Sequence, residues 1–191
     1  MTQSSPLLIG LSAVMVAVET DAPRVLVTQR ETGEYALPFG VFDPDRHRTF
    51  DLSLRGWVRE QTGFELGYVE QLYTFGDKDR ETPEATLSGA APNARVISVG
   101  YLALTPEARP AGDSFEARWQ SWYRYFPWED HRNGRPALID AHIAPRLMTW
   151  AAGNERRLER ARAAFALDGI RWIEERVLDR YELLYEAGLV I

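Results

Sequence analysis

The side chains that could do chemistry gather between residues 37 and 64, where carboxylates lie among basic, aromatic and amide groups. Glu60 stands on a helical pattern next to Gln61 and three residues after Trp57. Magnesium needs several anionic oxygen ligands, but Trp57 cannot ligate a metal and Gln61 offers only a neutral amide oxygen. The pattern favours a solvated Glu60 paired with a neighbouring arginine over a metal site.

A helix must position these side chains, and its two ends are marked in the sequence. Thr49 is a suitable N-cap, because its hydroxyl can accept a hydrogen bond from a free backbone N–H of the first turn. Gly63 stands where helices commonly end in the left-handed conformation. Residues three or four apart share a face of the predicted helix, here Phe50, Leu54, Trp57, Val58 and Gln61.

Composition limits the function classes. The chain has 191 residues, a net charge of −6, no cysteine and an apolar fraction of 45%. The apolar fraction is enough for a packed core, and the absence of cysteine excludes disulfides and thiolate metal sites. The negative charge argues against this chain alone wrapping nucleic acid. The apolar run Pro6–Val18 is too short to span a membrane and has no basic residue before it, so we expect a soluble, cytoplasmic protein without a membrane partner.

The first part of the chain reads as strands joined by loops. We expect strands at residues 7–18 and 24–30, which form a hairpin, and at 68–76, 95–104 and 116–128. Arg30 ends the second strand, where it could face an anionic ligand or simply be solvated. Residues 81–93 read as a loop with the length of a lid. The aromatic residues of the last strand are expected in the core rather than on a nucleic acid, because stacking also needs a basic groove; they are Trp119, Trp122, Tyr123, Tyr125 and Trp128.

From Pro136 onward the pattern becomes helical. We expect helices over 137–152, from Asn154 onward and over 170–187, the last with an apolar stripe at Ile170, Ile173, Val177, Tyr181 and Leu184. The fold class is therefore α+β, with a domain at 1–135 and a helical extension at 136–191. The apolar ending at 187–191 predicts either that the tail docks back or that the native chain continues.

The stretch LPFGVFDPDRHRTFDLSLRGWVREQTGF resembles the Nudix box, Gx5Ex7REUxEExGU with U aliphatic. With Gly63 as the anchor, Gly56 and Trp57 replace the Arg-Glu pair, Val58 takes the aliphatic position, and Glu60-Gln61 replaces the Glu-Glu pair. Gly40 lies two positions too far from Gly63 to open the box. The resemblance is to a degenerate box that has lost most of its metal-binding carboxylates.

Further segments resemble Nudix-related transcriptional regulators, most closely the alphaproteobacterial regulators of NAD biosynthesis. They are EQLYTFGDKDR, RVISVGYLALTP, YFPWED and RYELLYEAGLV. The resemblance implies a mixed β-sheet sandwiched by helices, a nucleotide-sensing role, a homodimer, and DNA binding only through a winged helix-turn-helix that this chain does not contain. NAD, ADP-ribose or ATP is the implied effector, with no cofactor and no metal required.

The resemblance also suggests ligand contacts. Arginine suits phosphate and aromatic rings suit a base, although each residue also has an ordinary structural role available. The predicted ligand-binding set is Arg55, Arg59, Glu60, Tyr73, Phe75, Asp77 and Arg80.

Two alternatives remain open at this point. The first is a magnesium-dependent Nudix hydrolase of ADP-ribose or a related nucleoside diphosphate, with oxygens drawn from Asp43, Asp45, Asp51, Glu60 and Glu65. Their spacing does not place them on one helical face, which makes this the weaker reading. The second is a dimerising scaffold, whose cleft would bind nothing.

Overall fold

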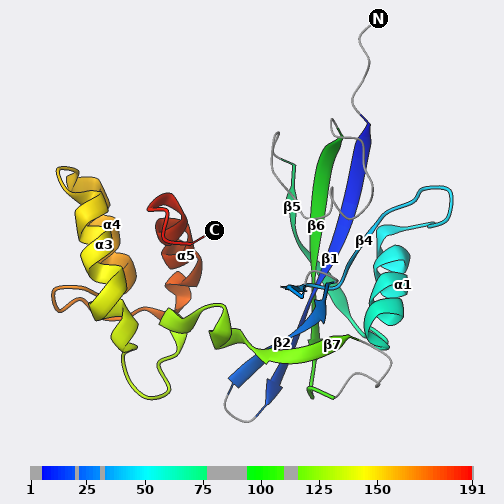
Figure 1. The fold of residues 1–191 in the computed structure, drawn as a ribbon, viewed down its shortest axis with the longest axis horizontal. Helices are drawn as coiled ribbons and strands as arrows, with labels where there is room; N and C mark the ends of the chain where they lie inside the picture. The colour runs from blue at the N-terminus through cyan, green and yellow to red at the C-terminus, as the bar shows by residue number, and fades with distance from the viewer. Residues whose placement is uncertain (1–5, 20–21, 31–32, 77–93, 110–115, 191) are drawn as a thin grey trace, which may run out of the picture. The chain divides into compact units, whose positions relative to one another are not determined.

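The computed structural model describes residues 6–19, 22–30, 33–76, 94–109 and 116–190 (Figure 1). These residues form two compact units, Met1–Trp122 and Tyr123–Ile191. We call them the first and second unit and describe each by itself. The division between the units precedes residue 136, where the helical pattern begins; the functional boundary at that residue stays a prediction.

The first unit is built on a mixed sheet of seven strands. β1 (Leu7–Glu19) and β2 (Ala22–Gln29) form the expected antiparallel hairpin, with Val16 opposite Val25. β6 (Arg95–Thr105) lies parallel to β1 along its whole length, from Leu7 opposite Arg95 to Ala17 opposite Thr105. The long apolar runs that predicted strands here are therefore the centre of the sheet.

The remaining strands extend this centre. The main order is β3-β2-β1-β6-β5, while β4 pairs with β1 and β7 with β2. Their bounds are β3 (Tyr35–Ala36), β4 (Phe39–Val41), β5 (Val69–Phe75) and β7 (Ala117–Ser121). β7 is shorter than the predicted strand 116–128, because the chain turns into two 3-10 segments at Trp122–Arg124 and Pro127–Glu129.

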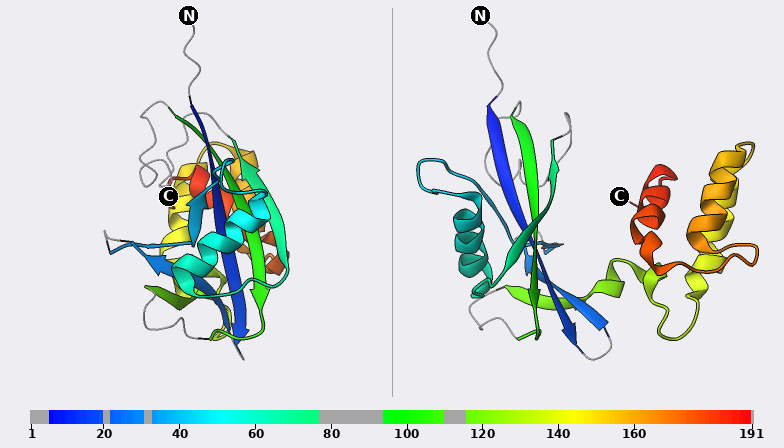
Figure 2. Two further views of the ribbon diagram at one scale, coloured as in Figure 1. Left: turned by 90° about the vertical axis from the view of Figure 1, so that its right-hand side faces the viewer. Right: turned by 180° about the vertical axis from the view of Figure 1, so that it is seen from behind.

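Helix α1 (Phe50–Thr62) lies across one face of the sheet (Figure 2). Both predicted ends are confirmed: Thr49 accepts a hydrogen bond from the N–H of Leu52, and Gly63 is left-handed with a φ of 71°. Leu54 and Val58 are fully buried. They pack on residues of β1, β2 and β6, namely Leu11, Ala13, Met15, Leu26, Val99, Tyr101 and Ala103.

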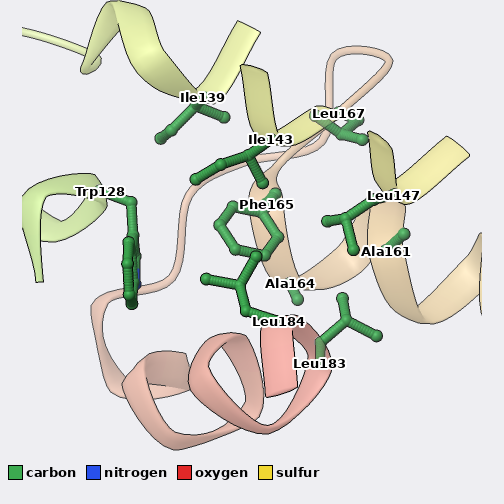
Figure 3. Packing of buried hydrophobic residues seen from close by; sticks show 10 residues of the cluster. All are labelled: Trp128, Ile139, Ile143, Leu147, Ala161, Ala164, Phe165, Leu167, Leu183 and Leu184. Carbon is green, nitrogen blue, oxygen red and sulfur yellow. The ribbon is translucent and has the colours of Figure 1, made fainter. Parts of the chain in front are cut away.

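The second unit is helical. A short π-helix at Ile139–Ile143 leads into α3 (Ala144–Ala151). α4 (Glu155–Phe165) follows, with Asn154 as its N-cap, as predicted. α5 is Val177–Glu186. Phe165 lies at the centre of the core, with Ile143, Leu147 and Leu184 directed toward it (Figure 3). Trp128 is also buried, which confirms the core prediction for this aromatic residue.

The predicted helix over 170–187 is wrong in its first third. Residues 170–173 are not helical, and a 3-10 turn at Glu174–Arg176 precedes α5. Ile170, Ile173 and Val177 are exposed, so the first part of the predicted stripe does not face the core. Its last two members do: Leu184 is buried and Tyr181 packs against the core. The buried face of α5 also carries Arg180 and Leu183. Within the described residues, no helix has the length and apolar character to cross a membrane.

Candidate functional site

The helix α1 turns two of its polar side chains toward β4. The indole Nε1 of Trp57 donates to the carbonyl of Val41 at 3.2 Å. The carboxamide of Gln61 bonds Phe39 twice: its Oε1 accepts from the backbone N–H at 3.1 Å, and its Nε2 donates to the carbonyl at 2.5 Å. Two of the positions that the box resemblance assigns to metal ligands therefore tie the helix to a strand.

Gly40 permits this close approach. A Cβ at Gly40 would lie 2.2 Å from ring atoms of Trp57, which is far inside van der Waals contact. The indole therefore covers the backbone of β4 directly. A glycine is needed here for packing against Trp57.

An aromatic group continues from Trp57 along the loop before α1. The rings of Phe42 and Phe50 meet edge to face at 4.7 Å, and His47 lies 6.2 Å from Trp57. The Nδ1 of His47 accepts from the N–H of Asp43 at 3.2 Å and lies 3.2 Å from the Ser53 hydroxyl. Two donors on one nitrogen assign the proton of the neutral ring to Nε2.

The carboxylates near α1 do not converge. Asp51 pairs with Arg55 at 2.9 Å, and Glu65 lies 3.9 Å from Arg59. Glu60 is exposed. Across the part of the chain that the structure describes, no group of three or more His, Cys, Asp or Glu is placed to hold a metal. The residues around α1 therefore do not fit magnesium, which requires several oxygens on one ion.

Arg55 has a structural role in the described residues. Besides its pair with Asp51, its guanidinium donates to the carbonyls of Leu66 and Gly67, the latter at 2.9 Å. These bonds fix the chain that follows α1. Arg59 is more available, since its side chain is 63% exposed.

The predicted aromatic contacts lie on β5. Tyr73 and Phe75 are exposed on that strand and meet at 4.8 Å between ring centroids. Asp77 and Arg80, like the loop 81–93, lie outside the described residues. The structure thus brings two of the seven predicted residues into contact with each other and commits Arg55 to neighbouring backbone; the ligand roles themselves stay predictions.

A hollow of 240 Å³ opens beside the Gln61–Phe39 pair. It combines one cation, one anion, an aromatic ring and several amide or hydroxyl groups. Its lining consists of Thr28, Gln29, Arg30, Ala36, Leu37, Phe39, Gln61 and Glu116. Sequence reasoning singled out Arg30 at its strand end but missed Glu116, which β2–β7 pairing brings next to Gln29.

Polar contacts fix the rim of this hollow. Gln29 donates to the carbonyl of Gly33 at 3.3 Å and accepts from Arg118 at 3.2 Å. Arg118 also lies over the ring of Tyr35, 4.9 Å from its centroid. Of the arginines near the hollow, Arg118 is held in the rim, and Arg30 is the one that lines the space.

No protein-family model matches the chain, and no curated protein matches it. Among solved structures, the NUDIX domain of Shewanella oneidensis NrtR complexed with ADP ribose is 20% identical, with a TM-score of 0.50 over 65% of this chain and 78% of that one. Shewanella oneidensis NrtR itself is 19% identical, with a TM-score of 0.50 over 75% of this chain.

The match spans 65% of the NrtR chain, less than two thirds of its length. A MutT/nudix family protein from Enterococcus faecalis is 26% identical, with a TM-score of 0.49 over 63% of this chain and 46% of that chain. The α+β architecture with its mixed sheet agrees with the two NrtR structures that have a TM-score of 0.50. The chain therefore has the Nudix fold.

Proposed function

We propose that the first unit is a non-catalytic nucleotide-binding domain, the sensing part of a transcriptional regulator of NAD metabolism. The carrying observation is that Trp57 and Gln61 hydrogen-bond to the backbone of β4. In the box resemblance these positions belong to metal-binding glutamates. Side chains already bound to backbone, one of them an indole, cannot polarise a phosphoryl group through a metal.

The hollow beside Gln61 is the place we assign to the ligand. Arg30 supplies a positive charge for a phosphate, Glu116 can accept from a ribose hydroxyl or a base amino group, and Phe39 offers an apolar wall. Because Gln61 is neutral where the box has a carboxylate, a phosphate meets no negative charge at that position. An anionic ligand can therefore bind without a metal ion to screen it.

ADP-ribose is the first ligand to test, because the NUDIX domain of NrtR was crystallised with it. NAD and ATP follow as the other effectors that the family resemblance implies. The wider role rests on that resemblance as well: a cytoplasmic homodimer that reaches DNA through a separate winged helix-turn-helix. Effector binding can regulate such a protein only if the two conformations bind it with different affinity.

The test is a thermal-shift panel of the whole chain with NAD, ADP-ribose, ATP and nicotinate mononucleotide, with and without magnesium, while the same mixtures are assayed for breakdown. A ligand that binds only the folded state stabilises it by about 2.7 kcal/mol at a hundredfold excess over its Kd. We expect a magnesium-independent shift with the nucleotide intact. Magnesium-dependent turnover would establish the hydrolase instead, and no shift from any nucleotide would leave a dimerising scaffold.

Matched variants locate the ligand. Arg30→Gln should raise the Kd of the ligand at least tenfold and so reduce the thermal shift. Arg48→Gln, on the exposed loop before α1, should leave the Kd unchanged. Gln61→Glu restores the carboxylate of the box, but it removes the donor to the carbonyl of Phe39. We expect this variant to lose binding without gaining magnesium-dependent turnover. Equal Kd values for the Arg30 and Arg48 variants would show that the ligand binds outside the hollow.

A further inference from the structure

A buried cation is the unusual feature of the second unit. The Arg180 side chain on α5 is 0% exposed, and its guanidinium forms two hydrogen bonds of 2.7 Å with the carboxylate of Glu129, itself 10% exposed. The same guanidinium donates to the backbone carbonyls of Ile173 at 2.8 Å and Glu174 at 3.1 Å. Arg180 thereby fixes the segment that enters α5.

An aromatic pair completes this arrangement. The guanidinium carbon of Arg180 lies 3.9 Å from the ring centroid of Trp172, close enough for a cation–π interaction. The imidazole of His131 stacks on the same indole, with 4.1 Å between centroids and 36° between planes. Two stretches far apart in sequence, 129–131 and 172–180, therefore meet at Trp172. We call Glu129, His131, Trp172 and Arg180 the Trp172 cluster.

His131 is the member of the Trp172 cluster that can change its charge near neutral pH. Its Nε2 is shielded from solvent and has no hydrogen-bond partner among the described residues. A neutral imidazole tolerates this arrangement, whereas a protonated Nε2 would be a buried donor without an acceptor. The neutral ring is the form that fits the stack.

Charged groups of both signs face His131. Arg180 on α5 and Arg135 on the following loop add positive charge. Glu129, which binds Arg180 through both oxygens, and Asp130 add negative charge. Asp130 and Arg132 beside the ring pair with each other at 2.7 Å.

Burial, the largest cause, lowers the pKa of His131. Arg135 and Arg180 lower it further, and Glu129 and a hydrogen bond with the backbone of Trp128 act against them.

We propose that the Trp172 cluster is a proton-sensitive latch, in which neutral His131 holds Trp172 against Arg180 and so fixes the segment 170–176 at the start of α5. Protonation of His131 places a second cation beside Arg180 and leaves Nε2–H without an acceptor. The ring then leaves the indole, and the entry to α5 loosens. This inference concerns the second unit and does not depend on the proposed ligand.

The sign of the pH effect follows from the lowered pKa. The unfolded chain takes up the proton at about pH 6.5, before the folded chain does. Stability contributed by His131 is therefore complete above that pH and is lost as the pH falls below it. The carboxylates of Asp140 and Glu186, whose pKa values their arginine partners lower, lose their contribution only in more acidic solution.

The test uses the whole chain, with exposed His142 as the reference. We expect an NMR titration of the wild type to give His131 a lower pKa than exposed His142. As the pH is lowered from 7.5 to 5.5, the amide protection factors at residues 173–180, which are corrected for intrinsic exchange, should fall, while those in α1 stay constant. His131→Phe, which keeps a ring on Trp172 but cannot titrate, should abolish that fall.

His142→Phe is the matched control and should behave as the wild type. The latch is overturned if exchange at 173–180 follows the same pH course in the His131→Phe protein and the wild type. It is equally overturned if His131 titrates at or above the pKa of His142. The wild-type titration needs no variant, so a His131→Phe chain that failed to fold would still leave a decisive measurement.

Discussion

The two units treat polar side chains in opposite ways. In the first unit, the neutral side chains of Trp57 and Gln61 form hydrogen bonds with the backbone of β4. In the second unit, a full positive charge at Arg180 is buried and met by Glu129 at 2.7 Å. At these places the first unit satisfies its polar groups with neutral hydrogen bonds, whereas the second unit buries a charge that an opposite charge must match.

The difference matters because the loss of one polar partner has a different free-energy cost in the two units. A neutral hydrogen bond contributes about 0.5–1.5 kcal/mol, and its loss is limited by the desolvation of one group. A buried ion pair contributes little net stability while intact, but removal of one partner leaves an uncompensated charge in the interior. The second unit should therefore be the more sensitive of the two to a single polar substitution.

The largest expected effect is at Arg180. Arg180→Met should destabilise the second unit by about 3–5 kcal/mol, because Glu129 would remain buried without a cation. Urea denaturation followed by circular dichroism and tryptophan fluorescence would measure this loss.

The double variant Arg180→Met with Glu129→Leu should recover most of the loss, since both charges are then removed. Arg146→Met, at an exposed arginine that donates to the carbonyl of His142, is the control and should change stability by less than about 0.5 kcal/mol. A double variant no more stable than Arg180→Met would mean that packing on Trp172, rather than charge, governs the site.

The intermediate effect tests the neutral packing of the first unit. Gly40→Ala should destabilise it by about 1–3 kcal/mol, because the new Cβ would overlap the Trp57 ring at 2.2 Å. Gly56→Ala within α1 meets no heavy atom within 4 Å and should instead stabilise by about 0.5–1 kcal/mol through helix propensity. Opposite shifts in melting temperature would support close packing at Gly40; shifts of the same sign would contradict it.

The sequence predicts the local parts of this comparison well. Both ends of α1 follow from Thr49 and Gly63, because a cap is set by residues within one turn. The central strands follow from continuous apolar runs, and Asn154 predicts the start of α4. That Trp57 and Gln61 cannot supply an anionic oxygen to a metal also follows from the sequence alone.

What those residues do instead is not readable, because their partners are distant. Gln61 bonds Phe39 across 22 residues, and Arg180 meets Glu129 across 51 residues. The helix predicted from residue 170 is wrong for the same reason. Ile170 and Ile173 fit a helical period, but Trp172 between them contacts the guanidinium of Arg180 on α5. Arg180 lies three and four residues before Leu183 and Leu184. This spacing places the three residues on one helical face and is the sequence signal for the burial of Arg180.

The smallest expected effect compares how a helix ends in each unit. α1 ends at left-handed Gly63, whereas α4 ends at left-handed Ala166 with a φ of 50° and places Leu167 in the core. A Cβ in this conformation is strained, so Ala166→Gly should stabilise the second unit by about 0.5–1 kcal/mol. Ala163→Gly, the same change inside α4, should destabilise by about 1 kcal/mol. If both variants lowered the urea midpoint equally, backbone strain at Ala166 would be negligible, and the two helix ends would be equivalent despite their different residues.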